Sequence, residues 1–277
     1  MNLALWRKAV SDAWLQLALS CLLLVLFSWV FVWLMSLFPL GAWGKLLNLL
    51  PGFVEPLVGI PLAKLASTAG KLSVLYVHVV TVLVCVGWAV GRGSNPISGE
   101  IGRGTMDLVV SLPVRRASIL VPPAVVATLG AVALAFSVLG GTTIGTMTVT
   151  LEGNVALRSF LPGVINLICL TFLLTGITMF VSSLTRDRWR AIAVTVGFFV
   201  ISIIVKMVGR LWPEDHWLDS RWFKYSSILT AFEPQRLILV PDKNQALWYD
   251  ATLVGTGLIC YLLAAVILTY RDIPAAR

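Results

Sequence analysis

The chain has 277 residues, of which 58% are hydrophobic and 12% are charged. Soluble domains average roughly 45–50% apolar and about 25% charged residues, so this chain has too few charges to cover a water-facing surface. A soluble globular protein is therefore excluded, and lipid is expected to be the main solvent. The formal charge of +8 does not indicate nucleic acid as a partner, because the basic residues lie in short breaks between apolar runs and form no basic cluster.

The first residues of the chain carry apolar side chains at helical spacing. Leu3, Trp6 and Val10 share one face, with charged residues on the others. This pattern predicts an amphipathic helix over residues 1–16 that lies in the membrane interface. A cleaved signal peptide is the alternative, but residues 15–38 are uncharged for longer than its typical apolar region. We expect an uncleaved anchor.

Six segments are long and apolar enough to cross the hydrocarbon core, which requires about 20 mainly apolar residues. Their apolar residues are continuous and do not alternate as in a barrel, so the sequence predicts an all-α polytopic membrane protein with six transmembrane helices. Residues 1–277 are expected to form one transmembrane domain. The predicted spans cover about residues 15–38, 72–91, 119–143, 159–184, 191–209 and 250–270.

Two segments do not fit a single straight crossing. The uncharged run over residues 117–151 is too long for one, and we expect its helix to begin near Pro122 and Pro123. The Gly and Thr residues at 140–143 are then expected to be loop or interface. Residues 39–71 contain several prolines among Leu and Val. They are expected to lie on or dip into the outer leaflet.

Sequence motifs for chemistry within the chain are scarce. The chain contains no GxxxxGK[ST], HExxH or GxSxG pattern, so no catalytic residue and no metal site are predicted. Its four cysteines lie in separate apolar runs and are expected to be buried free thiols. His78 and Asn166 are the candidate polar site inside the membrane. The alternative is that each only forms hydrogen bonds between helices.

The segment between the second and third spans, residues 92–118, is the longest one on the predicted inner side. The Asn-Pro pair at 95–96 is expected to start a helix. An apolar stripe that includes Met106 and Leu108 runs on until Pro113 ends it. These features predict a short amphipathic helix beneath the membrane, with one face free for a cytoplasmic partner. A solvated loop that only reverses the chain is the alternative.

Two sequence strings resemble ABC-2 type permeases. GEIGRGTMDL at residues 99–108, followed by SLPVRR at 111–116, is similar to their inner loop between the second and third spans. The ending YRDIPA at 270–275 resembles their terminus after the sixth span. The six spans and the N-terminal interfacial helix extend the resemblance over essentially the whole chain.

The resemblance implies a permease subunit of an ATP-driven transporter, expected to be an exporter. Energy would come from a separate cytoplasmic ABC ATPase subunit that binds ATP and Mg²⁺, while this chain binds no cofactor. The inner loop would act as a coupling helix seated in a cleft of that ATPase. The residues implied in docking are Glu100, Ile101, Gly104, Thr105, Met106, Asp107 and Leu108, with Leu112 and Pro113 closing the helix.

A second ATPase contact is a candidate role for Arg186, Asp187 and Arg188, between the fourth and fifth spans. The alternative is that these charges only set the orientation. Lys and Arg are denser in the segments placed inside when both termini are cytoplasmic, which favours that orientation. The resemblance implies a multi-pass protein of the bacterial cytoplasmic membrane.

Six spans make half of a transporter in this family, so a second permease copy, identical or a paralogue, is implied. The small residues Gly255, Thr256 and Gly257 could permit close helix approach in such a pair. Membrane lipids are the other expected partner, and the apolar residues 39–71 favour an amphipathic or lipid-like cargo. Two other functions remain open: an intramembrane enzyme that acts on a lipid or peptide through His78, and a noncatalytic anchor for a cytoplasmic partner.

Overall fold

The computed structural model describes residues 3–111, 115–153, 155–212, 222 and 226–270, and in these ranges the chain is helical without strands. Six helical segments are long and apolar enough to cross a membrane, which confirms the predicted all-α fold with six candidate spans. The long helices are α1 (Leu3–Ser36), α6 (Val79–Ser94), α9 (Val121–Thr148), α10 (Leu161–Leu184), α11 (Arg188–Leu211) and α14 (Lys243–Tyr270).

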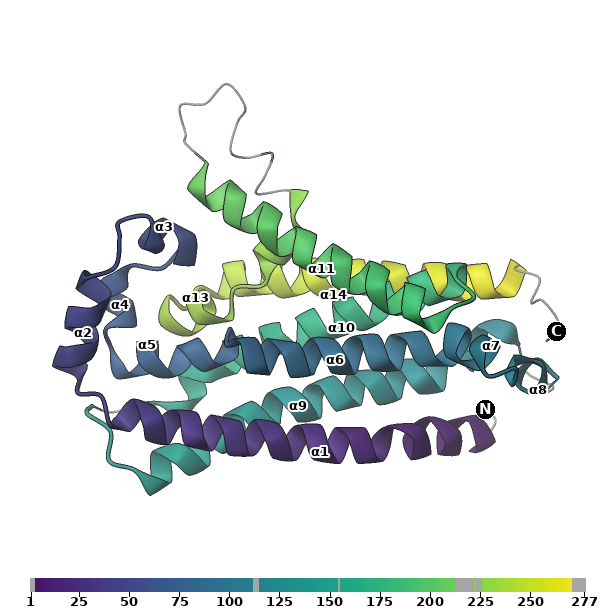
Figure 1. Ribbon diagram of the computed structural model, residues 1–277, viewed down its shortest axis with the longest axis horizontal. Coiled ribbons are helices and arrows are strands. Elements are labelled where there is room, and N and C mark those ends of the chain that lie inside the picture. The colour runs from purple at the N-terminus through teal and green to yellow at the C-terminus, as the bar shows by residue number, and fades with distance from the viewer. Residues whose placement is uncertain (1–2, 112–114, 154, 213–221, 223–225, 271–277) are drawn as a thin grey trace.

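Short helices gather at the two ends of the bundle. Figure 1 shows the long helices side by side, with one group of short helices beside the start of α1 and the other near its opposite end. The first group is η2 (Asn95–Gly99), α7 (Glu100–Gly102), α8 (Met106–Val110) and η3 (Arg116–Ile119). The elements towards the opposite end are α2 (Leu40–Asn48), α3 (Val54–Val58), α4 (Leu62–Leu65), α5 (Thr68–Ser73), η1 (Val74–Tyr76), η4 (Leu157–Phe160), η5 (Ile228–Ala231) and α13 (Pro234–Leu239).

Helix α10 forms the centre of the bundle. It packs against α6, α9, α11, α13 and α14, and it is the most buried of the six candidate spans. A hydrophobic helix can be buried on all sides when its polar groups are satisfied, and Thr175 and Thr178 donate to carbonyls one turn back on α10. Its crossing with α14 is close, since a Cβ on Gly257 would lie 2.8 Å from the Phe172 ring. Gly257 therefore packs within one chain.

Helix α1 differs from the predicted pair of an interfacial helix over residues 1–16 and a separate span. It is one continuous helix of 34 residues. At 1.5 Å per residue it measures about 51 Å, which exceeds the roughly 30 Å hydrocarbon core, so part of it extends beyond the core. Sequence alone suggested a break because charges occur only in its first turns. Charges that project from the end of a span beyond the core do not require a bend.

Helix α9 also continues further than predicted, so of the two alternatives for residues 140–143, loop or interface, the loop is wrong. Thr142 and Thr143 donate to carbonyls one turn back and stay inside the helix. The glycines lie where α1 approaches closely. A Cβ on Gly141 would lie 2.4 Å from the carbonyl oxygen of Val25, and one on Gly145 only 2.6 Å from Val32 Cβ. The glycines therefore serve helix packing, as small residues often do in membranes.

Residues 39–71 form a compact cap made of α2, α3, α4 and the first part of α5. Its buried apolar centre contains Leu47, Ile60 and Leu65. The indole N–H of Trp43 donates to the Leu65 carbonyl at 2.9 Å, and the Lys71 ammonium donates to the Phe38 carbonyl at 2.5 Å. These contacts hold the short helices of this proline-rich segment together. Its expected place in the outer leaflet stays a prediction.

Candidate functional site

The segment after α6 begins without a break in the helix. The Asn-Pro pair at 95–96 was expected to start a new helix, but it continues α6 through the π-helical turn η2. Proline lacks an N–H and clashes with the carbonyl four residues earlier, and a wider turn relieves both problems. After α7 the chain turns at Gly104, which has a positive φ of 69° and so favours glycine. Helix α8 follows this turn.

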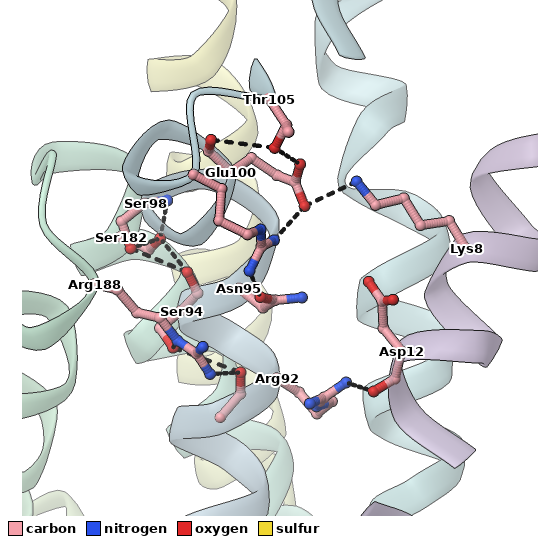
Figure 2. A network of polar contacts seen from close by, with 12 residues as sticks. Lys8, Asp12, Arg92, Ser94, Asn95, Ser98, Glu100, Thr105, Ser182 and Arg188 are labelled. Carbon is pink, nitrogen blue, oxygen red and sulfur yellow. Dashed lines mark hydrogen bonds and ion pairs between the residues drawn. The ribbon is translucent and has the colours of Figure 1, made fainter. Parts of the chain in front are cut away.

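Glu100 lies at the centre of a polar network at this end of the bundle (Figure 2). Its side chain is only 5% exposed and forms an ion pair with Lys8 of α1 at 2.9 Å. It also accepts hydrogen bonds from the Arg103 guanidinium and, at 2.6 Å, from the Thr105 hydroxyl. These contacts join α1 to α7 and hold the turn before α8. Glu100 thus faces the protein interior and is not placed for direct contact with a partner.

A second set of contacts ties the same segment to α10 and α11. The hydroxyl of Ser182 on α10 accepts from the Ser98 backbone N–H at 3.0 Å and donates to the Ser98 hydroxyl at 2.9 Å. Arg188, at the start of α11, donates to the Ser94 hydroxyl at 3.2 Å. Figure 2 shows these groups on the other side of α6 from Lys8. The segment that follows α6 is therefore fastened to several long helices.

Helix α8 has one buried face and one exposed face. Met106 is 3% exposed and packs with residues of α9, α10 and α14 that include Met179 and Leu268. Leu108 is 71% exposed, and Asp107 is exposed beside it. Leu108 and Asp107 are therefore accessible on a helix whose opposite face is anchored in the bundle.

The residues expected to dock an ATPase thus separate into three groups. Glu100 and Met106 are buried, Ile101 and Thr105 are half-buried, and Gly104, Asp107 and Leu108 are exposed. Leu112 and Pro113 lie outside the described residues. The sequence pattern found the segment but could not separate its two faces, because the burial of Glu100 depends on Lys8, far away in the chain.

The candidate second contact lies beside this segment. Asp187 caps α11 by accepting from the Trp189 backbone N–H at 2.9 Å, and both Asp187 and Arg186 are exposed. Arg188 is half-buried and turned towards Ser94. The structure therefore places Arg186 and Asp187 on the outside and gives Arg188 an internal anchoring contact.

The two candidate polar residues of the membrane interior lie in different surroundings. His78 precedes α6, accepts from the Val80 backbone N–H at 3.2 Å, and packs against the Phe27 ring at 4.9 Å between centroids. Asn166 of α10 is fully buried and donates to Asp250 at 2.8 Å, while its carbonyl accepts from the Glu233 backbone N–H at 2.9 Å. The structure does not bring the two together in one site.

A site that sequence reasoning missed lies next to Asn166. Lys206 is the charged residue of an otherwise apolar run over residues 191–208. Its ammonium forms an ion pair with Glu233 at 2.9 Å, and Arg210 of the same helix pairs with the same carboxylate. These side chains are 13%, 8% and 20% exposed for Lys206, Glu233 and Arg210. The available signal was the i, i+4 spacing of two cations on a span.

The three charged residues lie at one end of a groove of about 590 Å³ between α6 and α11. The groove is mainly apolar, and valine side chains such as Val82 and Val200 form much of its wall. Within the described residues, no group of three or more His, Cys, Asp or Glu side chains could hold a metal ion. The binding chemistry that the structure offers is therefore a pair of cations beside an apolar surface.

Comparison with known protein families gives a match over nearly the whole chain. A family model described as "ABC-2 family transporter protein" matches residues 6–270. The match runs from the first turns of α1 to the last residue of α14, so it includes both ends of the bundle. No curated protein matches the chain.

Proposed function

The chain belongs to the ABC-2 family of transporter proteins, and we propose that it is the permease subunit of an ATP-driven exporter with an amphipathic or lipid-like cargo. ABC-2 permeases are multi-pass transmembrane subunits without an ATPase motif of their own, and they act with an ATPase partner. In this proposal a separate cytoplasmic ATPase binds ATP and Mg²⁺ and docks on α7 and α8. This end of the bundle and both termini then face the cytoplasm of a bacterial cell.

The two faces of α8 carry this proposal. A partner that binds the exposed Leu108 and Asp107 would move α8. On the other face of this helix, Met106 packs against α9, α10 and α14. Since packed cores shift between discrete arrangements and do not deform continuously, the long helices would move with α8. The nucleotide favours the arrangement of the complex to which it binds more tightly. The cargo path would thereby alternate between the two sides of the membrane.

Glu100 takes a positioning role in this mechanism. Its carboxylate joins Lys8 of α1 to the turn before α8. The exposed face of α8 is thus presented at a fixed place relative to α1. A second permease copy, identical or a paralogue, completes the transporter, and each copy offers one α8 to one ATPase subunit.

The test is copurification of the chain with its ATPase, followed by measurement of ATP turnover. Interface residues near the centre of a contact often carry most of its binding energy, so Leu108→Ala combined with Asp107→Ala is expected to weaken ATPase association about tenfold. The matched control is Leu49→Ala, since Leu49 is 80% exposed at the opposite end of the bundle.

The two variants separate docking from general damage. The control is expected to retain its ATPase, and the double variant should keep the same thermal stability as the unmodified chain, because its side chains are exposed. Unchanged ATPase recovery and turnover in the Leu108 and Asp107 variant would overturn the assignment of α8. An activity of the purified chain alone, lost in His78→Ala, would replace it with the enzymatic function.

A further inference from the structure

The groove between α6 and α11 lies away from the proposed docking end. Its wall on α6 comes from the first half of that helix, including Val79 and Leu83, whereas α7 follows the other end. Figure 1 shows α11 inclined to the other long helices. Leu83 is 67% exposed and Val200 46%, so the groove is open along its side. A long apolar molecule can therefore enter from the lipid.

The end of the groove at Lys206 and Arg210 carries a net positive charge. Lys206 and Arg210 share one carboxylate, that of Glu233, so these three side chains have a formal charge of +1. Burying an unbalanced cation is unfavourable unless an anion accompanies it. The site as built therefore favours one further negative charge.

The cations are fixed in place but retain capacity for a ligand. Lys206 also donates to the Phe232 carbonyl at 2.7 Å, and Arg210 donates to the Leu57 carbonyl at 2.6 Å. In the part of the chain that the structure describes, the Lys206 ammonium thus has two acceptors for its three N–H donors. Glu233 is held through its backbone by Asn166. Asp250 is joined to the same asparagine and is not among the residues that line the groove.

We infer that this groove binds an anionic amphiphile, with its phosphate or carboxylate headgroup at Lys206 and Arg210 and its acyl chain along α6 and α11. The apolar wall supplies most of the binding surface, so a small free anion without a chain would gain little from it. The paired cations supply the selection for charge. That this molecule is the cargo rests on the proposed function; that the groove binds it does not.

Binding is tested with the full purified chain in a nonionic detergent by native mass spectrometry. The probes are phosphatidylglycerol and phosphatidylcholine with identical acyl chains. The unmodified chain is expected to retain phosphatidylglycerol in preference to phosphatidylcholine. Lys206→Met, which leaves Arg210 and Glu233 as a neutral pair, should lower phosphatidylglycerol affinity about tenfold, as expected for loss of a charged hydrogen bond.

A second variant predicts a change of opposite sign. Glu233→Gln keeps the shape of the side chain and raises the charge of the site, so phosphatidylglycerol affinity should increase. Lys45→Met, at an exposed lysine of α2, is the matched control and should change nothing. Val200→Trp should fill the groove and weaken the binding of both lipids. Glycerol 3-phosphate, which has the headgroup chemistry without the chains, should not displace bound phosphatidylglycerol.

The outcomes divide clearly. Equal retention of the two lipids by the unmodified chain would overturn the inference. Weaker phosphatidylglycerol binding in both Lys206→Met and Glu233→Gln would also overturn it, because a loss in both variants indicates that the cluster is purely structural. Displacement by glycerol 3-phosphate would also overturn it in favour of a free-anion site. No ATPase is present in this experiment, so a failure of ATPase docking would leave its result unaffected, and the reverse also holds.

Discussion

The two ends of the bundle use the same chemistry in different surroundings. At one end Glu100 pairs with Lys8 and Arg103, and at the other Glu233 pairs with Lys206 and Arg210. Both carboxylates are buried. Their cations differ, because Lys8 and Arg103 are 44% and 46% exposed, whereas Lys206 is 13% and Arg210 20% exposed.

This difference assigns different work to the two clusters. Water can solvate the cations beside Glu100, so that cluster mainly positions the turn before α8. The cations beside Glu233 have little water and adjoin an apolar groove, so their excess charge is available to a ligand. A carboxylate with two cations is thus a local clamp in one place and a candidate headgroup site in the other.

Removing Glu233 is expected to have the largest effect of the substitutions considered. Glu233→Ala leaves Lys206 and Arg210 poorly solvated and without their carboxylate, and breaking a buried ion pair in this way costs about 3–5 kcal/mol. The variant should show a much lower melting temperature in detergent, measured by intrinsic fluorescence. A shift no larger than that of Glu55→Ala, at an exposed glutamate of α3, would show that water reaches this cluster and would remove the contrast between the ends.

Helix packing is expected to be equally tight at both ends of the bundle. The difference between the two ends then lies in the exposure of their charged residues. A Cβ on Gly141 would meet α1 at 2.4 Å, and one on Gly93 of α6 would meet Thr178 at 2.6 Å. Gly141→Ala and Gly93→Ala are each expected to destabilise the protein by about 1–3 kcal/mol through overpacking. Gly140 and Gly102 have open space, so Gly140→Ala and Gly102→Ala are the matched controls.

The glycine variants are compared by melting temperature in the same detergent. The controls should be neutral or slightly stabilising, because alanine is the better helix former. Equal stability of Gly141→Ala and Gly140→Ala would contradict the close approach of α1 and α9.

The fold was largely predictable from sequence. Which face of each helix is buried and which is exposed was not. Long uncharged runs identify spans because every backbone group must be satisfied inside the bilayer. The end of α9 was mispredicted because glycine and threonine favour loops in water, whereas in a packed membrane helix they permit close contact with α1. Composition cannot distinguish these two settings without the neighbouring helix.

The candidate sites divide in the same way. The segment containing Glu100 was found because its motif is local in sequence. The Lys206 cluster was missed because Glu233 lies in a separate segment, where its backbone N–H donates to Asn166. Asn166 itself was considered both as a polar site and as a link between helices, and it forms hydrogen bonds with Asp250 of α14 and with the Glu233 backbone.

The smallest expected effect concerns salt. Exposed ion pairs are screened when the Debye length falls to about 3 Å at 1 M salt, and buried pairs are screened much less. Amide hydrogen exchange in α7 and around Thr105 should therefore accelerate in high salt, while exchange around Glu233 stays unchanged.

Lys8→Met should give the same acceleration at low salt, since it removes the cation that ties α1 to Glu100. Arg7→Met, on the neighbouring residue of α1, is the matched control. If salt accelerated exchange equally at both ends, the cations of the two clusters would be equally accessible to solvent, and the distinction between a positioning clamp and a headgroup site would fail.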